Sequence, residues 1–425
     1  MMTPDPIGAG EFAGWMDRLG PWPRPGSAPP VAVAVSGGAD SLALALLAAG
    51  WAEARGFPVL ALVVDHGLRE ESSGEAALTL RTLERHGIAA RLLPLAGLAR
   101  GPGLAERARD ARYQTLLQAC AEAGAVDLLL GHHRSDQAET ALIRRRASSG
   151  VSGLSGMSPL LELDTVRLLR PFLRVDPASL RATLVARGLS WIEDPSNRDR
   201  RAERTRVREE LATAAVLRAE LLRHADAAGQ ERADARAADA ALLAGTVSLR
   251  PEGFALLPPV LVPEDALAAL IRTVGGRPHR PASEAVRRLV RVPRAATLAG
   301  TRLLPAGRWG EGWLLVRETD SLAGPAPALP GARWDGRFVL RGSVPDGEQT
   351  FIAALGADAA SLRRRSRLPA AVLQALPSLR AADGALLAVP HLGWRADPRV
   401  EAVSFRFQPT MPASESTPFS ILERL

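Results

Sequence analysis

The stretch that most constrains this chain is VAVAVSGGADSLALALL, residues 31–47. Residues 31–35 are small and apolar with no polar face, which is typical of a strand buried on both sides in a parallel sheet. Residues 42–47 are again mostly apolar and fit a helix packed against that strand. The polar residues between them therefore form a strand-to-helix turn, the repeating unit of an α/β layer.

This turn has the composition of a phosphate-binding loop. Two glycines allow the backbone to bend tightly and approach a ligand, and the amides that open the following helix attract an anion. The loop residues are Ser36, Gly37, Gly38, Ala39, Asp40 and Ser41. A carboxylate would repel a bare phosphate, so Asp40 predicts a bridging Mg²⁺ ion. The sequence lacks the Gly-Lys-Ser/Thr ending of a Walker loop and the third glycine of a dinucleotide loop. The alternative is a tight turn that happens to contain two glycines.

Further strand and helix patterns alternate after the loop. Apolar strand-like runs lie near residues 58–65, 88–95 and 126–133, and helical patterns fill the intervals. This alternation predicts a doubly wound parallel sheet, whose ligands bind at the carboxyl ends of the strands. The polar groups that follow strands are the glycine loop, Asp65 with His66, and His132 with His133. We therefore expect one crevice built from three strand ends.

The composition narrows the chemistry. All 53 residues counted as lysine or arginine are arginine, which excludes Schiff-base chemistry and leaves phosphate contacts to guanidinium groups. The net charge of +7 is compatible with a polyanionic partner, although a genome of high GC content would also enrich arginine. The single cysteine, Cys120, excludes an intramolecular disulfide and a cysteine-based metal cluster. No signal peptide or membrane span is indicated, so we expect a cytoplasmic protein without a membrane partner.

The segment GHHRSDQAETALIRRR, residues 131–146, carries a second polar group. If a helix begins near Ser135, then His132, Asp136 and Glu139 are spaced to share its exposed N-terminal face. Asp136 could equally cap the helix. A zinc site at His132 and His133 is the weaker alternative, because adjacent side chains point in different directions and no third soft ligand lies near.

Several stretches together resemble the tRNA(Ile)-lysidine synthase family of the ATP pyrophosphatases. The matching stretches, in the family's order between about residues 31 and 208, are SGGADS, VDHGLR, ERARDARY, GHHRSDQAET, GVSGLSGM, RLLRPFL and WIEDPSNRDRRAERTRVR. The chain departs from the family at Ser135, where the first of two aspartates is usual, and at Thr205, where asparagine is usual. The residues 146–150 also differ from the family's Arg-Gly-rich turn.

The resemblance implies a reaction and its residues. Members use ATP to adenylate O2 of the wobble cytidine, position 34, in the CAU anticodon of tRNA(Ile), and free L-lysine then displaces AMP at C2. The loop residues 36–41, with Asp65 and His66, would bind ATP. Asp40 and Asp136 would hold Mg²⁺, and the catalytic residues implied are Asp40, His133, Asp136 and Arg112.

Arginines are the expected contacts to the RNA. Arg109 and Arg112 are three residues apart on one helix, so they share a face, and the alternative is a solvated charge pair. Six arginines fall within residues 198–208, where the alternative is a solvated helix face. The residues assigned to the substrate or tRNA by the resemblance are Arg109, Glu139, Arg204, Arg206 and Arg208.

The rest of the chain predicts two further domains. We expect an ATP-binding domain at residues 1–208, a mainly helical tRNA-binding domain at 209–320 with short strands at 298–316, and a small mixed domain at 333–410. Residues 321–332 are rich in Pro, Ala and Gly and are the best linker. The basic run 363–367 would contact the acceptor stem. The sequence leaves open a homodimer, another PP-loop ATP pyrophosphatase, and a non-catalytic nucleotide-binding regulator.

Overall fold

The computed structural model describes residues 4–22, 26, 29–67, 71–95, 101, 103–147, 154–163, 165–193, 202–344, 349–400 and 402–414. Two contact-dense units divide the chain between Asp234 and Ala235, within one long helix. Among the residues described, no helix combines the length and the apolarity that a bilayer span requires. The boundaries expected at residues 208 and 320 stay predictions.

The first unit contains the predicted parallel sheet. Its strands are β1 (Val31–Val35), β2 (Val59–Asp65), β3 (Ala89–Pro94), β4 (Asp127–Leu129), β5 (Leu160–Glu162) and β6 (Arg167–Leu169). They lie in the order β3-β2-β1-β4-β6-β5, and every pairing is parallel except that of β5 with β6. The sheet order changes direction between β1 and β4, which is where doubly wound folds bind ligands. The fold class predicted from the alternating pattern is confirmed.

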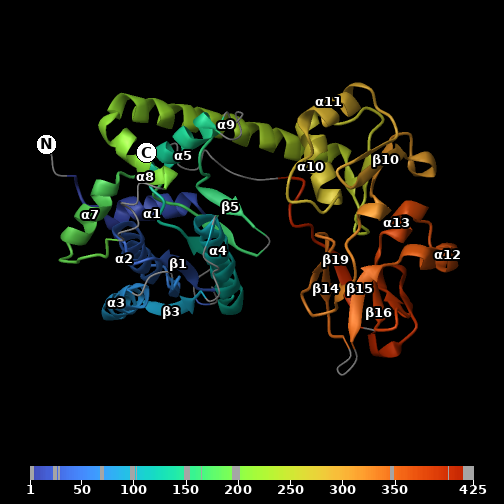
Figure 1. The fold of residues 1–425 in the computed structure, drawn as a ribbon, viewed down its shortest axis with the longest axis horizontal. Helices are drawn as coiled ribbons and strands as arrows, with labels where there is room; N and C mark the ends of the chain where they lie inside the picture. The colour runs from blue at the N-terminus through green and yellow to red at the C-terminus, as the bar shows by residue number, and fades with distance from the viewer. Residues whose placement is uncertain are drawn as a thin grey trace. The chain divides into compact units, whose positions relative to one another are not determined.

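Helices cover both faces of this sheet (Figure 1). The helices that follow and precede its strands are α1 (Ala9–Arg18), α2 (Ala39–Glu53), α3 (Ser72–Arg85), α4 (Leu104–Ala123), α5 (Arg134–Arg146) and α7 (Pro177–Val185). Two more helices, α8 (Glu203–Thr213) and the first part of α9 (Ala215–Thr246), pack on α5. Successive residues of β1 face opposite cores: Val31 and Val33 pack in the core that includes α2, and Ala32 packs in the core that includes α4. The buried strand expected at residues 31–35 is therefore observed.

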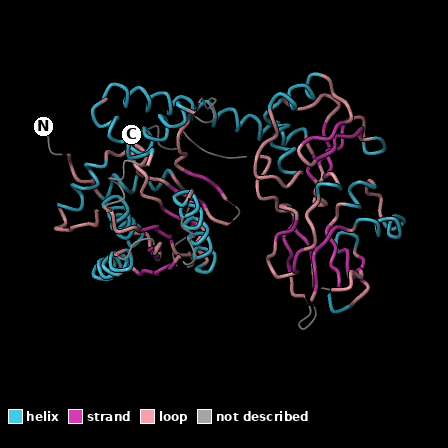
Figure 2. Tube along the Cα trace, in the orientation of Figure 1, coloured by secondary structure: helices cyan, strands magenta, loops and turns pink. Residues whose placement is uncertain are grey.

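The second unit is richer in strands than the sequence indicates. Its main helices are α10 (Glu264–Val274), α11 (Ser283–Arg291), α12 (Ala359–Leu362) and α13 (Ala370–Gln374). Its first sheet has the order β7-β8-β11-β10-β9 and consists of β7 (Ser248–Leu249), β8 (Ala255–Leu257), β9 (Ala296–Leu298), β10 (Thr301–Pro305) and β11 (Trp313–Arg317). The strands at 298–316 were expected, but β7 and β8 were not, because two or three residues show no readable alternation. Figure 2 shows these strands in magenta beside the helices.

The C-terminal part of this unit holds two more sheets. They are β12-β15-β16-β17-β18 and β13-β14-β19, built from β12 (Ala326–Pro327), β13 (Arg333–Trp334), β14 (Phe338–Arg341), β15 (Thr350–Ala354), β16 (Pro377–Ala381), β17 (Leu386–Val389), β18 (Trp394–Arg395) and β19 (Ser404–Phe407). The segment expected as a linker supplies β12, which pairs with β15. A buried ion-pair network of Arg317, Asp335 and Arg337 joins the end of β11 to the turn before β14. Residues 321–332 are thus packed within the unit.

Candidate functional site

The glycine loop lies at the carboxyl end of β1 and opens α2. Gly37 has φ +84°, and its carbonyl accepts a hydrogen bond from the amide of Ile192 at 3.0 Å. A Cβ atom at Gly37 would lie 2.4 Å from Thr79 Oγ1 and 2.8 Å from Ile192 Cδ1, so both backbone conformation and space require glycine there. The tight turn inferred from the sequence is therefore observed, and Ile192 packs against it.

The two loop serines brace the turn. Ser41 Oγ accepts from the amide of Ser36 at 3.1 Å, lies 3.1 Å from Ser36 Oγ and donates to Gly38 O at 3.1 Å. Gly38 is the N-cap of α2 and has no side chain to occupy the amides of the first turn. These amides, with the positive end of the helix dipole behind them, form an anion-binding position.

Asp40 and Asp136 contact the same imidazole ring. His133 Nε2 lies 3.4 Å from Asp40 Oδ2, and His133 Nδ1 lies 3.5 Å from Asp136 Oδ2. Asp136 Oδ2 also accepts from the His133 amide at 3.0 Å, which is the helix-capping role left open by the sequence. The ring thus stands between the two carboxylates and links the glycine loop to the start of α5.

The two carboxylates set the charge of His133. Burial acts to lower the pKa of His133, but the hydrogen bond with Asp40 and the negative charges of Asp136, Asp40 and Glu139 outweigh it, so the pKa is raised. His132 is in the opposite situation. Burial and the positive charges of arginines around it lower the pKa of His132 to about 3, so this ring is neutral at pH 7.

The spacing argument for one shared helix face is wrong. His132 precedes α5 in an extended segment and lies among arginines, whereas Asp136 contacts His133. Glu139 is 1% exposed and not on an open face; it forms an ion pair with Arg208 of α8, with Nε 2.7 Å from Oε1. The reason is tertiary: α8 packs over α5 and covers the side on which Glu139 lies. The adjacent histidines do point into different surroundings, which leaves the zinc alternative without a shared ligand position.

Asp65 and His66, which were also predicted for the site, lie at the carboxyl end of β2. Asp65 accepts from the hydroxyls of Ser72 and Ser73, both at 2.6 Å, and from the Gly67 amide, and these hydrogen bonds lower its pKa. His66 follows it at the same strand end. Leu68 and Arg69 of the same stretch, and residues 148–153 and 194–201, lie outside the described residues.

The arginines assigned to RNA occupy α4 and α8. Arg109 and Arg112 both lie over the ring of Tyr113, at 5.2 and 5.7 Å from its centroid. Arg204 donates to Thr140 Oγ1 at 3.4 Å, and Arg206 is exposed. Arg208 is occupied by Glu139, so its first role is to neutralise a buried carboxylate.

Two functional features escaped the sequence. Gly131 approaches the loop so closely that a Cβ there would lie 3.2 Å from Asp40 C and from Ser41 N. Arg170, at the end of β6, is 7% exposed and faces the same edge as His132. Both residues lie inside stretches that carry the family resemblance, Gly131 in GHHRSDQAET and Arg170 in RLLRPFL, but the local sequence does not show what either residue would contact.

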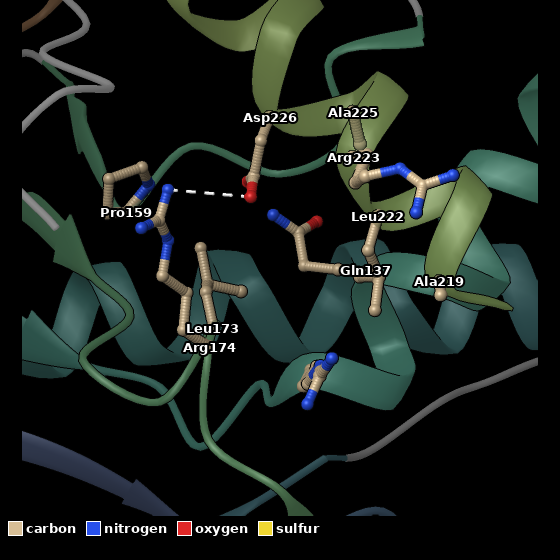
Figure 3. A pocket seen from close by; sticks show the side chains of 10 residues that line it. Gln137, Pro159, Leu173, Arg174, Ala219, Leu222, Arg223, Ala225 and Asp226 are labelled. Carbon is tan, nitrogen blue, oxygen red and sulfur yellow. Dashed lines mark ion pairs between the residues drawn. The ribbon is translucent and has the colours of Figure 1, made fainter. Parts of the chain in front are cut away.

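A separate cavity of about 280 Å³ lies between α5 and α9. It is lined by Arg134, Gln137, Pro159, Leu173, Arg174, Ala219, Leu222, Arg223, Ala225 and Asp226. Figure 3 shows the ion pair between Arg174 and Asp226 across this cavity, at 3.5 Å. Three guanidinium groups and one carboxylate make it a polar cavity, distinct from the glycine loop.

Comparison with known proteins gives the class of the first domain and the family of the chain. Residues 21–215 match the model of the PP-loop domain, so the first unit is a PP-loop ATP-binding domain. Relatives over most of the chain include a tRNA(Ile)-lysidine synthase of Ruegeria pomeroyi, 35% identical over 86% of this chain and 90% of that protein. Another from Methylobacterium nodulans is 40% identical over 71% and 88%, and one from Brucella suis is 36% identical over 77% and 79%. The chain belongs to the tRNA(Ile)-lysidine synthase family.

Among solved structures, a U34-tRNA thiolase from Methanococcus maripaludis has 15% identity and a TM-score of 0.44 over 52% of this chain and 78% of its own. This similarity is too weak to support a conclusion.

The loop geometry predicts that Gly37→Ala weakens ATP binding at least tenfold, because the new methyl group must displace Thr79 or Ile192 and the residue is held at positive φ. Isothermal titration with ATP measures the effect. Gly50→Ala is the matched control, since Gly50 lies in α2 with no atom within 4 Å of the added Cβ, and it should bind ATP normally. Equal affinity in both variants would contradict the loop assignment.

The environment of His133 predicts a pH effect in metal-free protein. Its folded pKa exceeds the unfolded value of about 6.5, so its stabilising contribution is complete below about pH 6.5 and is lost as the pH rises through the folded pKa. Asp40→Asn removes the negative charge beside the ring and should lower the pKa of His133, which an NMR titration measures. An unchanged pKa in this variant would show that Asp40 and His133 do not interact in solution.

Proposed function

We propose that this protein uses ATP to attach lysine to C2 of the wobble cytidine, position 34, in the CAU anticodon of tRNA(Ile), forming lysidine. The observation that carries this proposal is family membership over most of the chain, combined with a glycine loop whose geometry fits a nucleotide phosphate. We expect the reaction to take place in the cytoplasm, where ATP and tRNA are both present.

The chemistry explains why ATP is required. O2 of cytosine is a poor leaving group, so the first step joins O2 to the α-phosphorus of ATP and expels pyrophosphate. In the second step the lysine amine forms a bond to C2, the C2–O2 bond breaks, and AMP leaves with the oxygen while the amine loses a proton. The first-turn amides of α2 are placed to hold the phosphates of ATP in the first step.

Asp40 is the residue best suited to hold Mg²⁺ beside those phosphates. Its Oδ1 atom is buried and has no hydrogen-bond partner among the described residues. In the same residues no cluster of three or more His, Cys, Asp or Glu side chains has the arrangement of a metal site. This suits Mg²⁺, which binds through one or two carboxylates, waters and substrate phosphates. When bound, the ion would neutralise charge on the departing pyrophosphate.

Asp136 and His133 are positioned for the amine. Their contact at 3.5 Å forms a carboxylate–imidazole pair next to Asp40, and such a pair can accept the proton that lysine must lose. Glu139 lies one helical turn further along α5, with its charge balanced by Arg208. Asp65 and His66 at the end of β2 would border the nucleoside, and Arg109, Arg112, Arg204 and Arg206 would meet the RNA.

The alternatives predict different products. Another PP-loop ATP pyrophosphatase would release pyrophosphate with a different nucleophile, and a nucleotide-binding regulator would release none. A thiolase is disfavoured because the sequence contains one cysteine, buried in α4.

The direct test uses ATP, labelled lysine and two transcripts of tRNA(Ile) that differ only in C or U at the wobble position. We expect RNA-bound label and one pyrophosphate per label with the C transcript alone. Label on the U transcript, or pyrophosphate release without lysine transfer to either, would refute the proposal.

Conservative variants test the two carboxylates. Asp136→Asn keeps an acceptor for the His133 amide, so the helix cap and the thermal unfolding temperature should be retained. We expect Asp40→Asn and Asp136→Asn to lower the rate of tRNA-dependent pyrophosphate release at least 100-fold, because each removes a charge that the reaction needs. Full activity in either stable variant would remove that residue from the site.

A further inference from the structure

A group of arginines surrounds His132 at the edge of the sheet. β4 and β6 are parallel neighbours with Leu129 opposite Leu169, so His132 and Arg170 emerge at the same edge. The charges of Arg170, Arg109, Arg112 and Arg204 all act on His132. We call His132, Arg112, Arg170 and Arg204 the basic cluster; its members come from two strand ends, α4 and α8.

The positive charges of this cluster are not balanced. Within the ranges that the structure describes, none of its three arginines forms an ion pair with a carboxylate. Two other arginines of this unit do have such partners: half-buried Arg167 pairs with Asp127 at 2.6 Å, and exposed Arg208 pairs with buried Glu139 at 2.7 Å. This difference indicates that the positive charge of the basic cluster is available to an anionic ligand.

Burial makes this arrangement costly. Arg170 is 7% exposed, and burial lowers the pKa of Arg170 and of Arg112. The Nε atoms of both arginines and Nδ1 of His132 are buried without a hydrogen-bond partner among the described residues. Unpaired buried donors and charges destabilise a fold unless a ligand satisfies them.

Contacts with neutral groups orient these side chains without neutralising them. Arg170 Nη1 donates to Ser158 O at 2.8 Å, and Ser158 Oγ in turn accepts from Arg232 Nη2 at 2.8 Å. Arg112 is stacked on Tyr113. These contacts leave the Nε donors of Arg112 and Arg170 without a partner in the part of the chain that the structure describes.

We propose that the basic cluster is a phosphate subsite that binds one phosphodiester of the substrate RNA beside the reacting base. The planar guanidinium groups of Arg112 and Arg170 offer the paired donors that suit phosphate oxygens. Neutral His132 contributes a hydrogen-bonding ring without a further positive charge. This inference rests on the proposed function, because it assumes that RNA enters the crevice.

The pyrophosphate part of ATP is the other phosphate group that the basic cluster could bind. The first-turn amides of α2 already provide a position for the ATP phosphates at the end of β1, whereas the cluster extends to β6, beyond β4. Arg109 of α4 is exposed and extends the positive charge of the cluster along the helix. This suits RNA, which carries a negative charge at every nucleotide. These positions favour RNA.

The experiment is a binding cycle that needs no chemistry. Anticodon-arm RNAs carry a single uncharged methylphosphonate at each linkage around the wobble cytidine, one linkage per RNA, and affinities are measured without ATP or lysine. We expect one such substitution to weaken binding to the wild-type protein roughly 10- to 100-fold. Arg112→Gln and Arg170→Gln should weaken binding of unmodified RNA by a similar factor and should be indifferent to that same substitution.

Control measurements distinguish loss of the phosphate contact from a general loss of positive charge or from unfolding. Arg85→Gln removes the same charge at the exposed C-terminal end of α3 and should remain sensitive to the methylphosphonate. The slope of log affinity against log salt should fall by about 0.7 to 0.9 for each cluster variant. Arg112, which is less buried than Arg170, keeps the test available if Arg170→Gln does not fold.

The outcomes are distinguishable. If the cluster variants remain as sensitive as the wild type to every neutral linkage, the subsite is wrong. Normal RNA binding in those variants, together with weaker binding of inorganic pyrophosphate, would also overturn the proposal, because the cluster would then bind pyrophosphate and not RNA. If the wild-type protein binds no anticodon-arm RNA or full-length tRNA(Ile), the proposed function itself fails.

Discussion

The close approach of Gly131 to the backbone of Asp40 is the contact on which the site depends. β1 and β4 pair in parallel, so the segment after β4 must run past the start of α2. A Cβ at residue 131 would lie 3.2 Å from Asp40 C, so any residue larger than glycine would force the backbone of Asp40 to shift. This contact brings His133 within 3.4 Å of Asp40 and so joins two stretches separated by more than ninety residues. The sheet thereby assembles a site that neither stretch could form alone.

Asp136 shows that a structural and a chemical role can coincide. Its Oδ2 atom accepts from the His133 amide at the start of α5 and lies 3.5 Å from the His133 ring. The cap fixes the backbone that carries the histidine, and the same oxygen places a negative charge beside the ring. Capping and catalysis were competing interpretations of the sequence, but here one geometry would serve both. An asparagine would retain the first role and lose the charge of the second.

The sequence was most informative where local pattern decides structure. Residues 31–41 could be predicted as strand, turn and helix because apolar run, glycines and helix start are contiguous. The burial of Glu139 could not, because it depends on Arg208, 69 residues later in the chain. Strands of two or three residues, such as β7, carry no periodicity to read. Arg170 illustrates the same limit, since its neighbours are Ser158 before β5 and residues of α4.

The two adjacent histidines divide the charge at this edge of the sheet. His133 is extended, with φ −126° and ψ −177°, and in extended backbone neighbouring side chains point to opposite sides. One ring therefore faces Asp40 and Asp136 and has a raised pKa, while the other faces arginines and has a pKa of about 3. The proposed reaction would use both surroundings, the carboxylates for the lysine amine and the arginines for the RNA. Separating the two surroundings on successive residues places the carboxylates beside one ring and the arginines beside the other, so in the proposed reaction each set of charges would meet its own substrate.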